Sequence, residues 1–533
     1  MSIAGGQGSL GLWWLLRPTV LVASAMIRFS SSPAPSDDGF DLRSGTSSLI
    51  KASDQILIHV KVTTLLKDSG AAIQALVSLL CWVYKAAEVL VLACVRCITK
   101  AKVSWNSLQV LEKDFRDSAR VGCLSRRCKE LYLGVRNLDF DSAHANYAWD
   151  RFRLLNCLDR FMLQRGEKDI NKFRIHWIFD RENNDEYFRI MSWISYAVKC
   201  NVGSLIIELS MFGEMTLELP SCIFHCKSLR HLIVDVLNRG GKVLKMPSLA
   251  CYSNLQSLKL KNVTIQEEFG KWISECCKSI KELSLEQVFK TERISIESLS
   301  LESFSIACNY LVCSKDLLKL SVLNISGEKL AKISIVWQAP GGIDYLQIFS
   351  PNVKDLTLIG IFRNYISLGT LMCLEKSIIS PVGIYDSNKA LEVLCSVSRA
   401  KVLNLMGDII KVVFRDGCRT PPLDNVCCFS VLSVFSSLSD DLVPPMATLL
   451  KTMPNLIDLQ LSSAVISVNS RTSSSGFNIS YWKSLNLAFV DRLQNATLSI
   501  LNGNNEVEFA AYLLENATNL KKMSKETERR LLH

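Results

Sequence analysis

The chain has 533 residues, of which 48% are hydrophobic and 21% charged, with only 13 prolines. This composition excludes a wholly disordered chain, and the length fits either about three domains or one elongated repeat array with flanking modules. The formal charge of +10 comes from scattered Lys and Arg residues that do not alternate with aromatic residues, which argues against a nucleic-acid-binding protein.

Residues 1–50 combine two apolar runs with a stretch rich in Ser and Pro, and no acidic residue precedes Asp37. Targeting presequences avoid acidic residues and carry an apolar stretch, so a targeting segment is one interpretation. A disordered leader is the other, because the positive charges follow the first apolar run and Pro18 would break a helix.

Residues 51–116 predict an apolar helical segment, and the stretch 71–95 within it is the main candidate for a transmembrane helix. A spanning helix needs about 20 predominantly apolar residues, whereas Lys85 and Glu88 interrupt this stretch near its middle. A buried amphipathic helix is the simpler interpretation, and membrane association through 71–95 stays the alternative.

The 19 cysteines lie mainly inside apolar segments, where a free thiol acts as a small hydrophobic side chain. This usage is typical of a reducing compartment. We therefore expect a cytoplasmic or nuclear protein, with a membrane-associated location as the alternative.

A short apolar motif recurs from residue 202 onward. In Leu255-Gln-Ser-Leu258-Lys-Leu260-Lys-Asn-Val263 the spacing LxxLxLxxV matches one rung of a leucine-rich repeat. The same pattern, with aliphatic exchanges, starts at Val202, Leu229, Ile280, Leu301, Val353 and Leu456. Helix-like connectors such as 267–276 separate the motifs. The sequence predicts an α/β fold over residues 142–465: a curved leucine-rich-repeat solenoid with one strand plus a helix or turn per repeat.

The pattern changes near the C-terminus. A Ser-rich stretch at 466–476 breaks the repeat and marks a domain boundary. From Asn478 the alternation predicts a strand pair, followed by a helix over 506–515. We expect a small C-terminal α+β module at 478–525.

Three separated blocks resemble, in the same order, the plant F-box family whose members carry leucine-rich repeats and a C-terminal FBD domain. Residues 117–141, with LSRRC at 124–128 and LDFD at 138–141, are similar to the second half of an F-box. Residues 156–163 and 170–175 resemble the segment that joins the F-box to the repeats, and 193–201 follows it. Residues 219–229 and 269–277 resemble sequences of the repeat region. Residues 502–523 resemble the closing helix and strand of the FBD domain. The resemblance implies an F-box remnant at 117–141, the repeats, and an FBD-like domain at 478–525.

The resemblance also implies a function. Family members are substrate-recognition subunits of SCF-type ubiquitin ligases, so the implied partners are a Skp-type adaptor, a cullin and a protein substrate. An F-box opens with an LPxxLLxxILSFL-like helix that grips the adaptor, and no such run precedes Asp117. Most of the apolar docking face is then missing. The adaptor-binding candidates that are left are Leu124, Arg126, Arg127 and Leu131. The alternative is a repeat-based binding protein without adaptor docking.

The repeat strands also predict a partner-binding face. Side chains alternate along a strand, so the residues between the buried leucines point to the concave side. The candidates are Ser257, Lys259, Lys261, Glu282, Ser284, Glu286, Asp355, Thr357, Asp458 and Gln460. Rungs lie about 5 Å apart, which puts the Lys259/Lys261 pair within reach of Glu282 and Glu286 on the next rung. Pairing of these charges with one another is the plainer interpretation, and contact with a partner is the other.

Sequence motifs of catalysis are missing. The chain contains no GxxxxGK[ST], GxSxG or HExxH, and its six histidines form no series of metal ligands. The GxGxxG match at residues 6–11 has no strand before it, so it predicts no dinucleotide site. Asp139 and Asp141 are interpreted as strand-end residues of the LDFD segment. We therefore expect no enzyme, no cofactor and no metal site.

Overall fold

The computed structural model describes residues 126–525, with gaps at 144–147, 180–183, 211–218, 237–241, 244–253, 290, 309–319, 340, 383–385, 415–420, 434–437, 464–476 and 500–503. The chain divides into two units, Met1–Lys102 and Val103–His533, and every described residue belongs to the second. The predictions made for residues 1–116, including the helix at 71–95, lie outside the described residues. Of the helices that are described, none is long and apolar enough to span a membrane.

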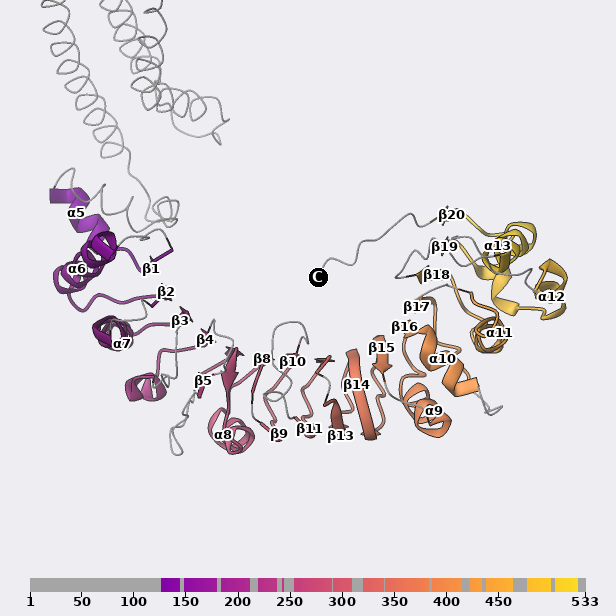
Figure 1. Cartoon of the computed structure of the whole chain (residues 1–533), viewed down its shortest axis with the longest axis horizontal. Coiled ribbons are helices and arrows are strands. Elements are labelled where there is room, and N and C mark those ends of the chain that lie inside the picture. The colour runs from indigo at the N-terminus through magenta and orange to yellow at the C-terminus, as the bar shows by residue number, and fades with distance from the viewer. Residues whose placement is uncertain are drawn as a thin grey trace, which may run out of the picture. The chain divides into compact units, whose positions relative to one another are not determined.

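An inner ladder of parallel strands runs from one end of the described region to the other (Figure 1). Each strand pairs in parallel with the next. The strands are, in spatial order, β1 (Asn137–Asp141), β2 (Lys172–Ile178), β3 (Ser204–Ser210), β4 (His231–Val236), β6 (Ser257–Lys261), β8 (Glu282–Glu286), β10 (Ser303–Cys308), β12 (Lys332–Trp337), β14 (Asp355–Ser367), β15 (Lys376–Val382), β16 (Val402–Met406), β17 (Cys428–Ser433), β18 (Asp458–Ser463), β19 (Asn495–Leu498) and β20 (Lys522–Lys525).

The core lies directly behind this ladder. In β6 the buried residues Leu258 and Leu260 alternate with half-buried polar ones, and the same alternation holds in most inner strands. Near the first rungs the core is aromatic, and the Phe140 and Phe173 rings meet edge to face with their centroids 5.2 Å apart. Burial of every second side chain fixes which side chains face outward, because a strand has a period of two.

The outer layer changes along the chain. Helices back both ends: α6 (Ala148–Arg165), α7 (Asn184–Lys199), η2 (Ser221–His225) and α8 (Phe269–Cys276) at one end, and α9 (Ser387–Ser396), α10 (Gly407–Phe414), α11 (Val443–Lys451), α12 (Ile479–Ser484), η5 (Ala488–Arg492) and α13 (Asn504–Asn516) at the other. A second parallel ladder backs the middle: β9 (Arg293–Glu297), β11 (Val322–Ser326), β13 (Ile343–Phe349) and the end of β14. Helix α5 (Arg126–Leu133) precedes β1, and β5 (Lys242–Val243) pairs with β7 (Val263–Thr264).

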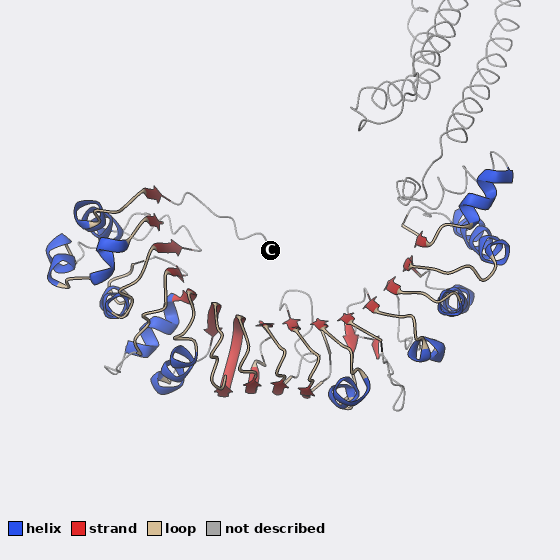
Figure 2. Cartoon of the chain, turned by 180° about the vertical axis from the view of Figure 1, so that it is seen from behind, coloured by secondary structure: helices blue, strands red, loops and turns tan. Residues whose placement is uncertain are grey.

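This difference in the outer layer accounts for the curvature of residues 126–525. Strands stack about 4.8 Å apart, whereas packed helices need 8–10 Å. Helix-backed rungs must therefore spread on their outer side, while strand-backed rungs stay nearly level. Figure 2 shows the flatter stretch in the middle, with the helices on the outside of both curved ends.

The observed helices and strands test several of the predictions made from the sequence. The strands lie at the predicted motifs, and α8 occupies the helix-like connector at 267–276. The strand pair expected from Asn478 is wrong: α12 and η5 occupy 479–484 and 488–492. The Asn478 side chain accepts a hydrogen bond from the Tyr481 N–H and caps a helix there. The domain boundaries at 142 and 478 stay predictions, although the inner ladder continues across both.

Gly360 lies where β14 leaves the inner ladder for the outer one. Its φ is +128°, and a Cβ built there would lie 1.8 Å from the main-chain oxygen of Trp337 on β12. Both the backbone conformation and the close approach exclude any other residue.

We expect Gly360→Ala to lower the midpoint of chemical denaturation strongly, because the neighbouring strand must shift. The matched control is Gly166→Ala, which also has a positive φ, +67°, but whose Cβ would meet nothing within 4 Å. That change should cost only the roughly 1–2 kcal/mol of a left-handed residue. Equal midpoints for the two variants would contradict this account of the strand switch.

Candidate protein-binding face of the inner ladder

Three rows of side chains run across the concave face of the ladder. In β6 they are represented by Ser257 (first row), Lys259 (central row) and Lys261 (third row), and the parallel register places the equivalent residue of each strand beside them. The central row reads Asp139, Arg174, Ile206, Ile233, Lys259, Ser284, Ser305, Ser334, Thr357, Ile378, Asn404, Ser430 and Gln460. The third row begins Asp141, His176, Glu208, Asp235, Lys261 and Glu286.

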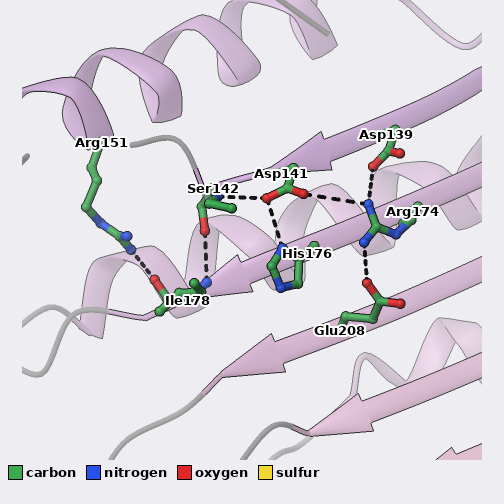
Figure 3. A network of polar contacts seen from close by, with 9 residues as sticks. Asp139, Asp141, Ser142, Arg151, Arg174, His176, Ile178 and Glu208 are labelled. Atoms are coloured by element: carbon green, nitrogen blue, oxygen red, sulfur yellow. Dashed lines mark hydrogen bonds and ion pairs between the residues drawn. The ribbon is translucent and has the colours of Figure 1, made fainter. Parts of the chain in front are cut away.

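Arg174 on β2 connects the charges of the first three rungs (Figure 3). Its Nη1 donates to Asp139 Oδ1 at 2.9 Å, and its Nη2 donates to Glu208 Oε2 at 2.5 Å. Asp141 Oδ2 lies 3.8 Å from Nη1. Burial lowers the pKa of Arg174, but Asp139 and Glu208 outweigh that effect and hold the pKa above its usual value. One guanidinium therefore ties together carboxylates from β1 and β3.

Asp141 on β1 has its own set of donors. His176 Nδ1 lies 2.9 Å from Asp141 Oδ1, and the Ala143 N–H donates to the same oxygen at 2.7 Å. Burial raises the pKa of this carboxyl, but the hydrogen bonds from His176 and Ala143 and the nearby positive charges outweigh it, so the pKa lies below its usual value. The ionised form is the one that the folded protein stabilises.

Two helices hold these rungs in place. The Glu186 carboxylate on α7 accepts hydrogen bonds from Arg151 Nη2 on α6 at 2.5 Å and from Trp177 Nε1 on β2 at 3.0 Å. The guanidinium of Arg151 also lies 5.6 Å from the centroid of the Trp177 ring. Because Trp177 directly follows His176, this buried cluster fixes the position of the strand that carries Arg174 and His176.

The charges of the next rungs are also engaged with one another. Lys261 Nζ lies 3.0 Å from Glu286 Oε1 and 3.9 Å from Asp235 Oδ2, and Lys259 Nζ lies 3.9 Å from Glu286 Oε2. Asn262 Nδ2 donates to Asp235 Oδ1 at 2.8 Å. Burial raises the pKa of Asp235, with Glu208 and Glu286 adding to it, and the Asn262 hydrogen bond and Lys261 offset this only in part.

The predicted concave-face residues can now be placed. The lysines Lys259 and Lys261 pair with Glu286 as the plainer interpretation expected, whereas Glu282 accepts a hydrogen bond from Ser257 Oγ at 3.1 Å. Further along, Gln460 Nε2 donates to Ser462 Oγ, and Asp458 accepts from Cys428 Sγ. The structure places Ser284 on β8, and Asp355 and Thr357 on β14. Contact of these residues with a partner stays a prediction.

The adaptor-binding candidates lie on or before α5. Arg126 is exposed and Leu131 half-buried, Arg127 belongs to the same helix, and Leu124 lies outside the described residues. Their part in adaptor binding is likewise still a prediction.

Sequence reasoning missed Arg174 and His176 as functional candidates. Residues 170–175 were interpreted as part of a joining segment, whereas β2 is the second rung of the ladder. The alternation of Lys172-Phe-Arg-Ile-His-Trp-Ile178 is the signal that could have found them. In the part of the chain that the structure describes, no group of His, Cys, Asp or Glu side chains could hold a metal ion.

The parallel ladder with alternate side chains buried defines an open leucine-rich-repeat solenoid, which confirms the predicted fold class. The family model for the repeats of the FBD-associated F-box protein At5g56370 matches residues 190–326. Among proteins of Arabidopsis thaliana, F-box/LRR-repeat protein 13 is 25% identical over 431 residues, which cover 77% of this chain and 84% of that protein.

Two further relatives agree. F-box/FBD/LRR-repeat protein At1g78750 is 24% identical over 437 residues, or 77% of this chain and 85% of the relative. F-box protein At4g09920 is 33% identical over 144 residues, or 26% of this chain and 42% of the relative. These findings confirm the resemblance: the chain is similar to plant F-box proteins with leucine-rich repeats, some of which also carry an FBD domain.

The low pKa of Asp141 predicts a pH effect on stability. Its carboxylate stabilises the folded state fully above the usual Asp pKa, and that contribution is lost as the pH falls through the lower pKa of the folded state. The denaturation midpoint of Asp141→Asn, which has no charge to lose, should therefore fall less between pH 5 and pH 3 than that of the unchanged protein.

The control for this measurement is Asp355→Asn, at an exposed position on β14. Its midpoint should fall as steeply as that of the unchanged protein. An equally steep fall for Asp141→Asn would show that the hydrogen bonds from His176 and Ala143 do not stabilise the ionised carboxylate.

Proposed function

We propose that this protein is the substrate-recognition subunit of an SCF-type ubiquitin ligase. The single observation that carries the proposal is the uninterrupted inner ladder from β1 to β20, which offers one long face of side chains for recognition. F-box/LRR-repeat protein 13 aligns with 77% of this chain at 25% identity, and this similarity supports the same role.

In this role the protein performs no bond chemistry of its own. It holds a protein substrate on the concave face while an adaptor and a cullin bring the ubiquitin-transferring enzyme to it. A sheet suits this task, since its outward side chains are set by buried neighbours and lose little conformational freedom on binding. The proposal includes an adaptor because the relatives are named as F-box proteins.

The adaptor side would involve α5. This helix directly precedes β1 and packs against α6, so it joins the repeats without an intervening domain. On this helix Arg126 is exposed, whereas Leu131 is half-buried. A docking surface at α5 would leave the concave face open for the substrate.

The test is capture of a purified Skp-type adaptor and cullin by the full chain at micromolar concentration, with an intact F-box relative as positive control. We expect capture by the unchanged chain and a loss of about tenfold or more for Leu131→Arg, because a charge at a half-buried docking position opposes burial.

The matched control is Leu514→Arg, the same change at an exposed position on α13, where 64% of the residue is accessible. It should capture the adaptor as the unchanged chain does. If the intact relative binds and this chain does not, the ligase role is wrong, and the protein recognises partners without delivering them to a ligase.

A further inference from the structure

The central row of the concave face carries charged side chains on the first strands but none from β8 to β17. From β8 to β17 it consists of Ser284, Ser305, Ser334, Thr357, Ile378, Asn404 and Ser430, all half-buried and none charged. Within the described residues, the hydroxyl and amide groups of this row form no hydrogen bond with the protein. This part of the face therefore offers a line of unused hydrogen-bonding groups.

The third row, beside it, is apolar from β10 to β17. Its members are Ala307, Val336, Ile359, Met406 and Leu432, with Ser380 as the single polar residue among them. All of these side chains are half-buried. An apolar row thus lies next to a hydrogen-bonding row for the whole distance from β10 to β17.

The first rungs have neither a row of unused hydrogen-bonding groups nor an apolar row beside it. Arg174 is engaged by Asp139 and Glu208, and the Lys261 ammonium is engaged by Glu286. A partner that binds there must break ion pairs that the protein already makes. The free groups of β8–β17 have no such competitor.

The chemistry of these two rows defines the ligand that would cover them. A half-buried hydroxyl that loses water without gaining a hydrogen bond costs about 1–3 kcal/mol. A charged side chain placed on these two uncharged rows would lose water without gaining a counter-ion. The surface that covers these two rows is therefore uncharged, and it supplies hydrogen bonds on one side and apolar groups on the other. The first row, on the far side of the central row, carries the exposed charges of Lys332, Asp355 and Lys376.

An extended polypeptide meets these requirements better than a helix. The main-chain N–H and C=O groups of a helix are already bonded within the helix, whereas those of an extended chain are free. Six neighbouring strands about 4.8 Å apart, from β10 to β17, span about 24 Å, which equals about seven residues of extended chain. Such a chain can place main-chain groups over the central row and alternate side chains over the apolar row.

We propose that strands β10–β17 of the concave face bind an extended segment of about seven residues in a partner protein, with an apolar residue at every second position. Its main chain lies on the central row and its apolar side chains lie on the row of Val336, Ile359 and Met406. This inference rests on the proposed function and deepens it, because it names the part of the face that meets the substrate and the class of segment that it takes.

The probe is a phage-displayed library of random 12-residue peptides, panned on the full chain. Selected peptides are synthesised, and their Kd is measured by fluorescence anisotropy. We expect sequences with an apolar residue at every second position, which matches the spacing of side chains along one side of an extended chain. Their affinity should fall at least about tenfold for Ser334→Arg, which puts a large charged side chain in the middle of the central row.

The matched control is Ser257→Arg, the same substitution on β6 beside Glu282, in the part of the face where charges pair. It should change the Kd by less than about twofold. Circular dichroism and the denaturation midpoint establish that both variants fold.

Three results would overturn the inference: selected peptides without an apolar residue at every second position, affinity lost for Ser257→Arg but kept for Ser334→Arg, or no peptide above background. Adaptor capture by the Ser334→Arg chain separates the two proposals. If peptide binding fails while capture persists, only this inference is wrong. If capture fails while peptides bind, only the ligase role is wrong.

Discussion

Register between the parallel inner strands is the constraint on which the rest of the structure depends. Each strand buries alternate residues, such as Leu258 and Leu260 of β6, and its neighbours pair with it without a shift. A slip of one residue would turn these leucines to solvent and the lysines into the core. Because this register persists from rung to rung, residues separated by 34 or 35 positions in sequence, such as Arg174 with Glu208 and Asp139, meet side by side.

The outer layer then determines how the same inner ladder is used. Helices behind the first and last rungs force the sheet to curve, and outer strands behind the middle leave it flatter. The charged network of Arg174, Asp141 and Glu208 belongs to a curved, helix-backed end, where the Arg151, Glu186 and Trp177 cluster steadies it. The free hydroxyl row begins close to where the outer strands begin. One continuous sheet thus has a self-paired end and a stretch with unused hydrogen-bonding groups.

Most of the fold could be predicted from the sequence, because each rung is defined by residues that are close together in the chain. The spacing of Leu255, Leu258 and Leu260 defines a rung, and alternation alone places Lys259 and Lys261 on the exposed side. The outer strands were not predicted, since Arg293–Glu297 alternates as an inner strand does and period alone cannot tell the two layers apart. The strand pair expected after Asn478 failed because a single capping side chain started a helix where alternation suggested a strand.

The candidate site was harder to predict, because its chemistry depends on neighbours from other rungs. The sequence around Lys261 does not show that its ammonium pairs with Glu286, and the sequence around Ser334 does not show that its hydroxyl has no partner among the described residues. Asp141 was placed correctly at a strand end, whereas Asp139 lies in the middle of β1. Their partners Arg174 and His176 lie on β2, in a segment that was interpreted from its family resemblance and not from its alternation. Whether a polar side chain is used or free is a property of the assembled ladder.

Hydrogen–deuterium exchange of the full chain, followed by mass spectrometry, tests most directly whether one ladder organises the whole described region. The account predicts slow exchange of main-chain amides in β1–β3 and in β18–β19, comparable to that of β10–β16, because all of them donate to neighbouring rungs of one sheet. Exchange at unfolded rates in either end group, with β10–β16 still protected, would contradict a single continuous face.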